Sequence, residues 1–225
     1  MSAAAKPRDA ASIILLRRQG RGLAVLTGQR GATAKFMPGR YVFPGGVLAP
    51  PDSRASGFSE DLPAQPQGLG AATERRLAAF ARAALRELYE ETGLLLGSPA
   101  PEGTTGPSGG CWQAYERAGL RPAFSALRLV ARAITPSSAP LRFHTRFFLA
   151  DGDLAEGALG GDGELENLGW RPFAEFARLP SAEISRLVLA EARVHRTQPA
   201  RPAARFFWTG AGKRRSAPDG TAAPA

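Results

Sequence analysis

The sequence predicts an α/β fold of the α+β kind, in which helices cover both faces of a mixed β-sheet. Three features of the chain indicate this fold. Short apolar runs that are typical of strands lie in both halves of the chain, and one long amphipathic helix separates them. Helical periodicity also follows the later strands, so that one helix can cover each face of the sheet.

The first two strands are expected to form a hairpin. The runs at 11–18 and 23–27 are apolar, and the segment Gln19–Gly22 between them carries two glycines. A third, brief strand is expected at 40–47, where Pro44, Gly45 and Gly46 would end it. Later strands are predicted at these positions: 126–134, 141–150, 164–170 and 205–208.

The long helix is predicted to run from Thr73, a plausible N-cap, to Gly93, which suits the left-handed residue that ends a helix. Its apolar positions recur at helical spacing and form one face. They are Leu77, Phe80, Ala81, Ala84, Leu85 and Leu88. Short helices are expected near 173–178 and 181–195.

Two Gly- and Pro-rich stretches interrupt this pattern. Residues 49–71 are predicted to be an inserted loop, and residues 97–124 a second irregular stretch with one helical turn around 112–119. We expect a single domain over residues 1–208, because 225 residues leave little room for two domains. Residues 209–225 are expected to form a basic, flexible tail.

The composition is that of a globular protein, with 44% hydrophobic and 22% charged residues. No apolar run approaches the roughly 20 residues that span a bilayer, and no small-residue cleavage site follows the apolar run near the start. The cytoplasm is therefore the expected compartment. A single cysteine, Cys111, excludes an internal disulfide and a cysteine-rich zinc site.

The net charge is +9, and residues 193–215 hold seven basic and no acidic residues. This balance favours polyanionic partners such as nucleotides, coenzyme phosphates or nucleic acid. A GC-rich genome yields a similar composition, so charge alone does not identify the partner.

Three glutamates crowd the end of the long helix. Glu87, Glu90 and Glu91 project within an arc of about 100° that borders the apolar stripe. Carboxylates at a half-buried edge repel one another, and in the last turn they also face the negative end of the helix dipole. A divalent cation relieves both effects, and oxygen ligands suit Mg²⁺ or Mn²⁺. The alternative is an ordinary solvated acidic helix face.

The segment RELYEETGL, residues 86–94, resembles the core of the Nudix box. The upstream VFPGG, residues 42–46, is similar to the strand and glycine turn that open this box. The family places a glutamate between the glycine turn and the helix, five residues after the glycine and eight before the arginine. The position eight before Arg86 is Ala78, and a long insertion of about 30 residues separates the glycines from the helix. Such an insertion resembles the coenzyme A diphosphatase-like branch, as do Asp52 and the segments 36–46 and 142–148, whereas Ala49 and His144 depart from it.

The resemblance implies the Nudix fold and a Mg²⁺- or Mn²⁺-dependent pyrophosphohydrolase. It implies that Glu90 and Glu91 are metal ligands, that Glu87 is the general base or a further ligand, and that Arg86 orients the helix or a loop through a salt bridge. On an ideal wheel Arg86 projects away from the glutamates.

Other site residues lie outside this helix. A backbone carbonyl at Gly45 is a candidate metal ligand, because glycine permits close approach. Glu164 is our choice for a later carboxylate that completes the site, with Asp162 and Glu166 as rivals.

Arg142 and Arg146 share a strand face with His144. Both arginines are candidate ligands of substrate phosphates, and the alternative is a solvated or salt-bridged face.

The expected partner is a small-molecule diphosphate, either a nucleotide or a CoA derivative. Coenzyme A or acyl-CoA ranks first, and ADP-ribose, NADH and dinucleoside polyphosphates are alternatives. Two other classes stay open: a catalytically silent nucleotide-binding module, and a nucleic-acid-binding protein that uses 193–215. The sequence does not fix the oligomeric state, and a homodimer is compatible with it.

Overall fold

The computed structural model describes residues 5–54, 74–101, 109–208 and 214–218. Its strands are β1 Arg8–Gln19, β2 Gly22–Arg30, β3 Tyr41–Val42, β4 Gly45–Val47, β5 Leu95–Pro99, β6 Leu120–Pro122, β7 Arg128–Ile134, β8 Phe143–Asp151, β9 Ala155–Glu156, β10 Leu165–Pro172, β11 Ala204–Trp208 and β12 Arg214–Pro218. Its α-helices are α1 Pro50–Arg54, α2 Glu74–Thr92, α3 Gly110–Arg117, α4 Phe173–Phe176 and α5 Glu183–Thr197.

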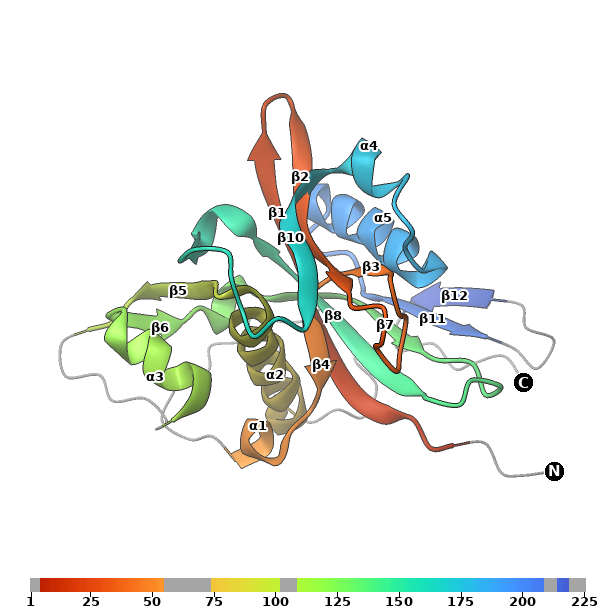
Figure 1. The fold of residues 1–225 in the computed structure, drawn as a ribbon, viewed down its shortest axis with the longest axis horizontal. Helices are drawn as coiled ribbons and strands as arrows, with labels where there is room; N and C mark the ends of the chain where they lie inside the picture. The colour runs from red at the N-terminus through yellow and green to blue at the C-terminus, as the bar shows by residue number, and fades with distance from the viewer. Residues whose placement is uncertain (1–4, 55–73, 102–108, 209–213, 219–225) are drawn as a thin grey trace.

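A mixed sheet forms the centre of the molecule (Figure 1). Its strand order is β10-β2-β1-β8-β7-β11-β12, with β3 added to β2 and β4 added to β1. β1 and β8 are parallel, as are β7 and β11, whereas the other pairs are antiparallel. A smaller sheet has the order β6-β5-β9.

Helices cover both faces of the large sheet. In β1, Ile13 and Leu15 pack in one core cluster with Phe80 and Leu85 of α2. Ile14 and Leu16 point to the opposite face because side chains alternate along a strand, and they belong to a second cluster that includes residues of α4 and α5. The predicted α/β architecture is therefore confirmed, and β1 is buried on both sides.

Most predicted elements are present, but four segments differ. The expected strand at 40–47 is two strands, because Gly45 and Gly46 do not end it: they pair with Ser12 and Ala11 of β1. The predicted loop at 49–71 contains α1, and its remainder from 55 onward lies outside the described residues.

The other two differences concern segments with little periodicity. Residues 97–124 were expected to hold one helical turn, yet they contain the end of β5, the two-turn helix α3 and the strand β6. In the stretch expected to be flexible after residue 208, β12 pairs with β11 in an antiparallel hairpin. The predicted N-cap Thr73 lies outside the described residues. Within the described part of the chain, no helix combines the length and the apolar character that crossing a bilayer requires.

Candidate active site

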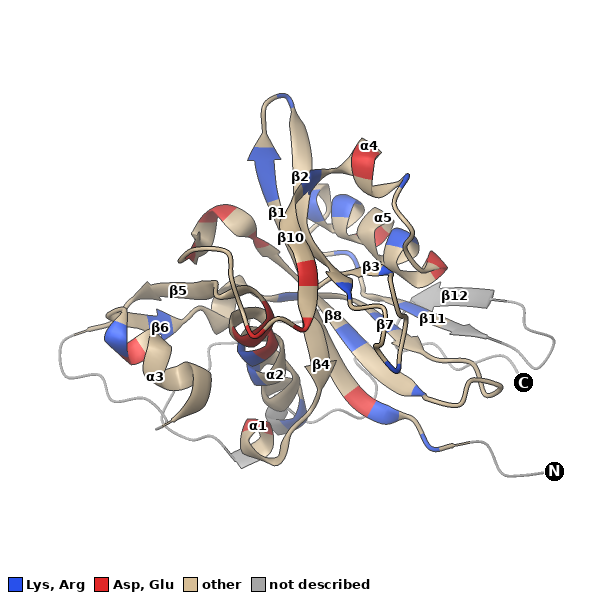
Figure 2. Ribbon diagram, in the orientation of Figure 1, with Lys and Arg blue, Asp and Glu red and all other residues tan. Residues whose placement is uncertain are grey.

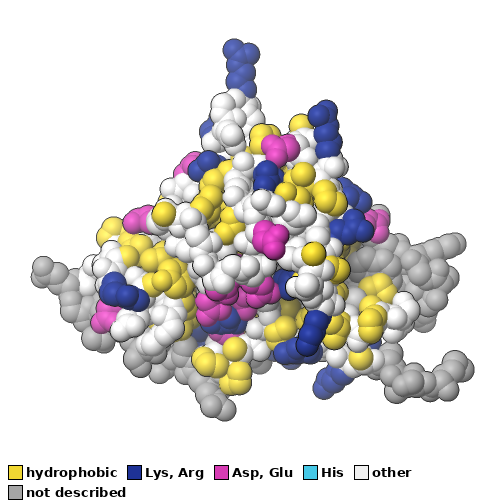
Figure 3. Space-filling model, in the orientation of Figure 1, with side chains coloured by type: hydrophobic (Ala, Val, Ile, Leu, Met, Phe, Trp, Pro, Cys, Tyr) yellow, Lys and Arg dark blue, Asp and Glu magenta, His cyan; other side chains and the backbone are white. Residues whose placement is uncertain are grey.

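The site is built at the C-terminal end of α2, the helix that packs across β1 and β4 (Figure 1). Its apolar face is buried, with Phe80, Ala84 and Leu88 fully enclosed. The helix ends at Gly93, which has φ 73° and donates its N–H to the carbonyl of Tyr89 at 2.7 Å. Because the buried stripe fixes the rotation of α2, Glu87 and Glu91 face the two glycines at the start of β4. Figure 2 shows acidic residues at this end of α2, and Figure 3 shows acidic side chains gathered on this part of the surface.

Glu91 is the most deeply buried of the three glutamates, with 2% of its surface exposed. Its Oε2 atom accepts a hydrogen bond of 2.8 Å from the backbone N–H of Gly45. Burial raises the pKa of Glu91 to about 9, and the negative charges of Glu87 and Glu164 add to this effect. The Gly45 hydrogen bond opposes the rise. In the absence of a cation the buried carboxyl therefore favours its protonated form.

Glu87 lies against Gly46, the second residue of β4. A Cβ atom at Gly46 would be 2.3 Å from Glu87 Oε1, so a larger residue there would displace this carboxylate. Burial raises the pKa of Glu87 above its ordinary value, while the charge and hydrogen bond of Arg86 offset part of the rise.

Arg86 lies within the carboxylate cluster. Its Nη1 donates to Glu87 Oε1 at 2.7 Å and to Glu90 Oε2 at 2.8 Å. Its Nε and Nη2 reach the two carboxylate oxygens of Asp52 in α1, each at 3.0 Å. The expected salt bridge is present, but the prediction that Arg86 projects away from the glutamates is wrong. An ideal wheel places only the Cα–Cβ direction, and the long guanidinium side chain bends back over the next turn.

Glu164 enters the site from the loop before β10. Its Oε1 accepts a hydrogen bond of 2.8 Å from Arg30 Nη2 in β2, and its charge acts on both Glu87 and Glu91. Its two rivals do not line the cavity: Asp162 Oδ1 accepts the backbone N–H of Glu164 at 2.9 Å, and Glu166 is exposed.

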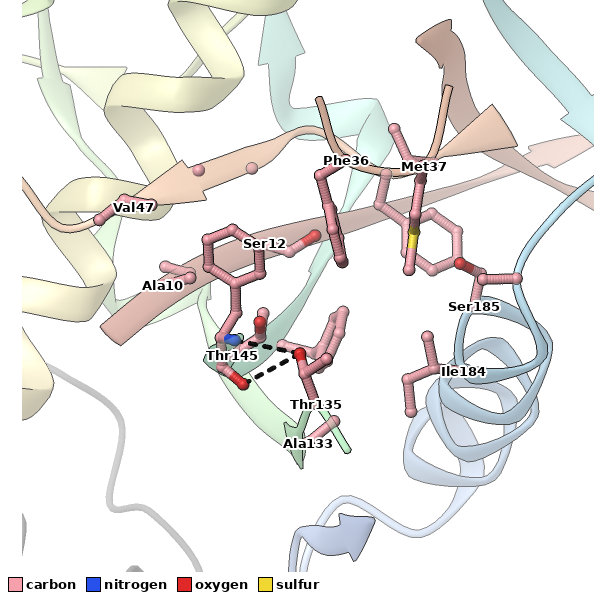
Figure 4. Close-up of a pocket in the computed structure, with 18 of the residues that line it drawn as sticks. Ala10, Ser12, Phe36, Met37, Val47, Ala133, Thr135, Thr145, Ile184 and Ser185 are labelled. Atoms are coloured by element: carbon pink, nitrogen blue, oxygen red, sulfur yellow. Dashed lines mark hydrogen bonds between the residues drawn. The ribbon is translucent and has the colours of Figure 1, made fainter. Parts of the chain in front are cut away.

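A cavity of about 470 Å³ opens beside these carboxylates (Figure 4). Glu87, Glu164, Arg30, Gly45 and Gly46 lie at one part of its wall. The rest is formed by β1, β7, β8, the β2–β3 connection and the start of α5, and most of this lining is apolar. Its volume is within the range of roughly 300–1,000 Å³ that is usual for small-molecule sites.

The structure does not bring Arg142 and Arg146 into this cavity. Phe143, Thr145 and Phe147 of β8 line it, and residues between them on a strand point to the other face. Arg146 is 4% exposed and lies over the Phe80 ring at 3.7 Å. Arg142 donates to the carbonyls of Thr135 and Ala5. The prediction that they bind substrate phosphates therefore has no support in this arrangement.

No family model matches the chain. A NUDIX hydrolase from Alicyclobacillus acidocaldarius superposes with a TM-score of 0.65 and 30% identity over 85% of this chain and 93% of that one. This chain is a member of the Nudix hydrolase family. The putative nudix hydrolase 7 of Caenorhabditis elegans is 39% identical over 88 residues, which are 39% of this chain and only 22% of that protein.

The NUDIX domain of Shewanella oneidensis NrtR, solved with ADP ribose, shares the fold of this Nudix chain. It superposes with a TM-score of 0.51 and 14% identity, covering 85% of this chain and 89% of that one.

Asp52 lies between the glycines and the helical segment that resemble the Nudix box. Five residues separate Gly46 from Asp52, which is the spacing at which the family's glutamate is expected. Asp52 is 1% exposed and holds Arg86 through both carboxylate oxygens, while its backbone carbonyl accepts a hydrogen bond of 2.6 Å from Arg82. The family spacing counted back from Arg86 leads to Ala78, which is not acidic. The same spacing counted forward from Gly46 leads to Asp52.

The donor set fits a hard divalent cation. Glu87, Glu90 and Glu91 offer carboxylate oxygens, which Mg²⁺ and Mn²⁺ prefer, and burial without a cation raises the pKa of both Glu87 and Glu91. Among the described residues, no three acidic, histidine or cysteine side chains are already gathered closely enough to enclose an ion. Arg86 provides the positive charge between Glu87 and Glu90 in this arrangement.

Proposed function

We propose that this chain is a metal-dependent pyrophosphohydrolase that cleaves the diphosphate joining a nucleoside to another group. The observation that carries the proposal is the grouping of Glu87, Glu91 and Glu164 around the two glycines at the start of β4, beside a cavity sized for a small molecule that Glu87 and Glu164 line. Family membership supports the same chemistry.

The metal is proposed to be Mg²⁺ or Mn²⁺, held by Glu87, Glu90 and Glu91. When bound, such an ion neutralises phosphate charge and makes water more acidic. The carbonyl of Gly45 stays a candidate for a further ligand, because its N–H already fixes Glu91 at this turn.

The protein's own groups hold the reacting atoms in place. Glu87 or Glu164 is proposed to accept the proton of the attacking water, since both carboxylates line the cavity. Arg86 keeps Glu87 and Glu90 oriented from the side of α1, and Arg30 does the same for Glu164. Both arginines therefore act through the carboxylates.

Coenzyme A or acyl-CoA is proposed as the first substrate to test. The segment 36–46, the insertion after Gly46 and Asp52 resemble the corresponding branch, and the structure adds that Asp52 holds Arg86. ADP-ribose, NADH and dinucleoside polyphosphates are the alternatives. ADP-ribose should be tested among them because the NrtR domain was solved with ADP ribose.

One observation favours a catalytically silent nucleotide-binding module as a second candidate. Arg86 already neutralises Glu87 and Glu90, which reduces the need for a cation there. A nucleic-acid-binding role for 193–215 would show as a steep salt dependence of RNA or DNA affinity.

The test is an incubation of the purified protein with Mg²⁺ or Mn²⁺ and coenzyme A, acyl-CoA, ADP-ribose, NADH and diadenosine polyphosphates, with products identified by mass. Release of 3′,5′-ADP and a phosphopantetheine species would establish the coenzyme A activity. Cleavage of another compound would keep the chemistry and change the substrate. Binding without cleavage, with either metal, would favour the silent module.

A further inference from the structure

The cavity beside the carboxylates has two chemically different parts. Charged groups gather where Glu87, Glu164 and Arg30 reach its wall. Beyond them lies a pocket that we name the apolar chamber. It is formed by Phe36, Met37, Phe43, Ala133, Phe147 and Ile184. In Figure 4, Phe36 and Met37 extend from the β2–β3 connection towards Ala133 and Thr135 on the sheet, and Ile184 faces them from α5.

The connection that carries Phe36 and Met37 is firmly held. The N–H of Gly39 and the carbonyl of Arg40 both bond to the backbone of Arg30, at 3.0 Å each. The Phe36 ring meets Phe143 edge-on, with 4.7 Å between centroids. The apolar chamber is therefore formed before any ligand enters.

Met37 has φ 52°, a conformation that is uncommon for a residue other than glycine. Such backbone strain is retained where the surrounding structure fixes it, and it is concentrated at ligand sites. A methionine side chain also adapts to apolar ligands of different shape.

Few polar atoms remain available near the apolar chamber. The hydroxyl of Ser12 donates to the carbonyl of Pro44 at 2.9 Å, and that of Thr135 bonds to both the N–H and the carbonyl of Phe143. Arg30, the sole cation among the described residues that line the cavity, is paired with Glu164. Away from the carboxylates, a ligand group would meet only three further polar side chains among the described lining residues, those of Thr145, Glu183 and Ser185.

We propose that the apolar chamber binds an aliphatic group that the substrate carries next to its diphosphate. This inference rests on the proposed function, because the carboxylates set where the diphosphate lies. A nucleobase would lose water from its polar edge and find few side-chain groups to replace it, which is costly, and a further phosphate would meet no unpaired cation among the described lining residues. An aliphatic group needs neither, and each buried methylene improves its binding.

The first experiment uses a series of P²-alkyl esters of ADP, from methyl to octyl, with Mn²⁺. These compounds keep the nucleotide and the diphosphate constant while the chain grows. We expect kcat/KM to rise about threefold per methylene until the apolar chamber is full. A flat or falling series, with the methyl ester or ADP-ribose still cleaved, would overturn the inference and leave the proposed function intact.

The second experiment narrows the apolar chamber from α5. Ala182 lines the cavity at the start of this helix, whereas Ala190 is exposed on the same helix and does not line it. Ala182→Leu is expected to shorten the alkyl chain at which kcat/KM stops rising. Ala190→Leu is expected to leave the dependence of kcat/KM on chain length unchanged. Ile184→Thr, which keeps the branched shape and adds a hydroxyl, should reduce the gain per methylene. Series that are identical in all three variants and the wild type would contradict the assignment.

A third experiment separates this inference from turnover. The same alkyl series is made with a methylene group bridging the two phosphorus atoms, so that it cannot be cleaved there, and its Kd is measured by calorimetry with Mn²⁺. Tighter binding and a more negative heat-capacity change with chain length would support the apolar chamber even if no diphosphate were hydrolysed. Affinity that is independent of chain length would overturn the inference, whatever the catalytic result.

Discussion

Glu91 combines almost complete burial with a single backbone partner, the N–H of Gly45. A glutamine of the same size can accept that hydrogen bond, but it cannot supply the charge that a cation requires. We therefore predict that Glu91→Gln and Glu90→Gln each lower kcat by about 10²-fold or more while the protein remains folded. The measurement is Mn²⁺-dependent turnover of the best substrate, together with circular dichroism. Glu116→Gln, an exposed change on α3, is the control, and wild-type turnover in either variant would reject the metal assignment.

Asp52 of α1 and Arg86 of α2 form an ion pair that joins the two helices. The side chains are 1% and 15% exposed, and both carboxylate oxygens are used. Removing one member of such a buried pair leaves the other charge without its partner. Asp52→Asn is predicted to lower the free energy of unfolding by about 3 kcal/mol and to reduce kcat, because Arg86 also holds Glu87 and Glu90.

Urea unfolding measures this loss of stability. The matched control is Glu175→Gln, which removes an exposed i,i+4 partner of Arg171 and should cost about 0.5 kcal/mol or less. Equal losses in the two variants would show that the Asp52 pair contributes no more than a surface pair.

Among the elements, the glycine-rich loop 157–163 has the closest connection to the end of α2. The N–H groups of Gly160 and Asp162 donate to the carbonyls of Thr92 and Glu90, which have no partner within the helix. The next residue along the chain is Glu164. The loop thus caps the helix that carries three carboxylates and also delivers the fourth.

Gly161 is the tightest point of that contact. It has φ 112°, and a Cβ atom there would lie 2.3 Å from the carbonyl oxygen of Glu91. Gly161→Ala is predicted to push the loop away from α2 and to lower kcat by about 10- to 100-fold, because small displacements of catalytic groups are costly. Steady-state kinetics test this. Gly20→Ala is the control, since Gly20 has φ 58° in the β1–β2 turn with no atom near a Cβ. A Gly161 variant as active as the Gly20 variant would contradict the role of the loop.

The periodic elements were predictable from sequence, and the irregular ones were not. The hairpin of β1 and β2, the strand β8 and the helix α2 show strong apolar periods, and all are present. β5 and β6 contain Gly97, Pro99 and Pro122 and pair over only three residues, so local pattern hides them. α1 begins at two prolines within a stretch that reads as a loop.

The site divides in the same way. The grouping of Glu87, Glu90 and Glu91 follows from helical spacing within one element. The contacts of Arg86 with Asp52 and of Arg30 with Glu164 join residues 34 and 134 positions apart, and local spacing has no access to them. Arg142 and Arg146 are candidates for phosphate binding from sequence because they share a strand face with His144, and only tertiary packing decides whether that face meets the cavity.

At the scale of the whole molecule, the buried histidines and the buried Glu91 have opposite effects on how stability depends on pH. Burial, with nearby arginines, lowers the pKa of both His144 and His195 to about 4. The folded state then binds fewer protons than the unfolded state, so this contribution is present above pH 6.5 and is lost as the pH falls through 4. Glu91 has a folded pKa of about 9, so its contribution is present below pH 4.5 and is lost as the pH rises through 9.

We therefore predict that the metal-free protein is most stable close to pH 6.5, because below it the two histidines lose more stability than Glu91 gains, and that its Tm falls on both sides. Thermal unfolding in a chelator across pH 4–9 measures this. His195→Gln should reduce the fall of Tm at acidic pH, and Glu91→Gln should reduce the fall of Tm at alkaline pH, because each substitution removes one titrating group. Mn²⁺ should raise the Tm of the wild type more at pH 8 than at pH 5, since it binds the ionised carboxylates. A Tm in chelator that stays level from pH 6 to 9 would mean that Glu91 is ionised without a cation, and the electrostatic case for a metal at this site would be lost.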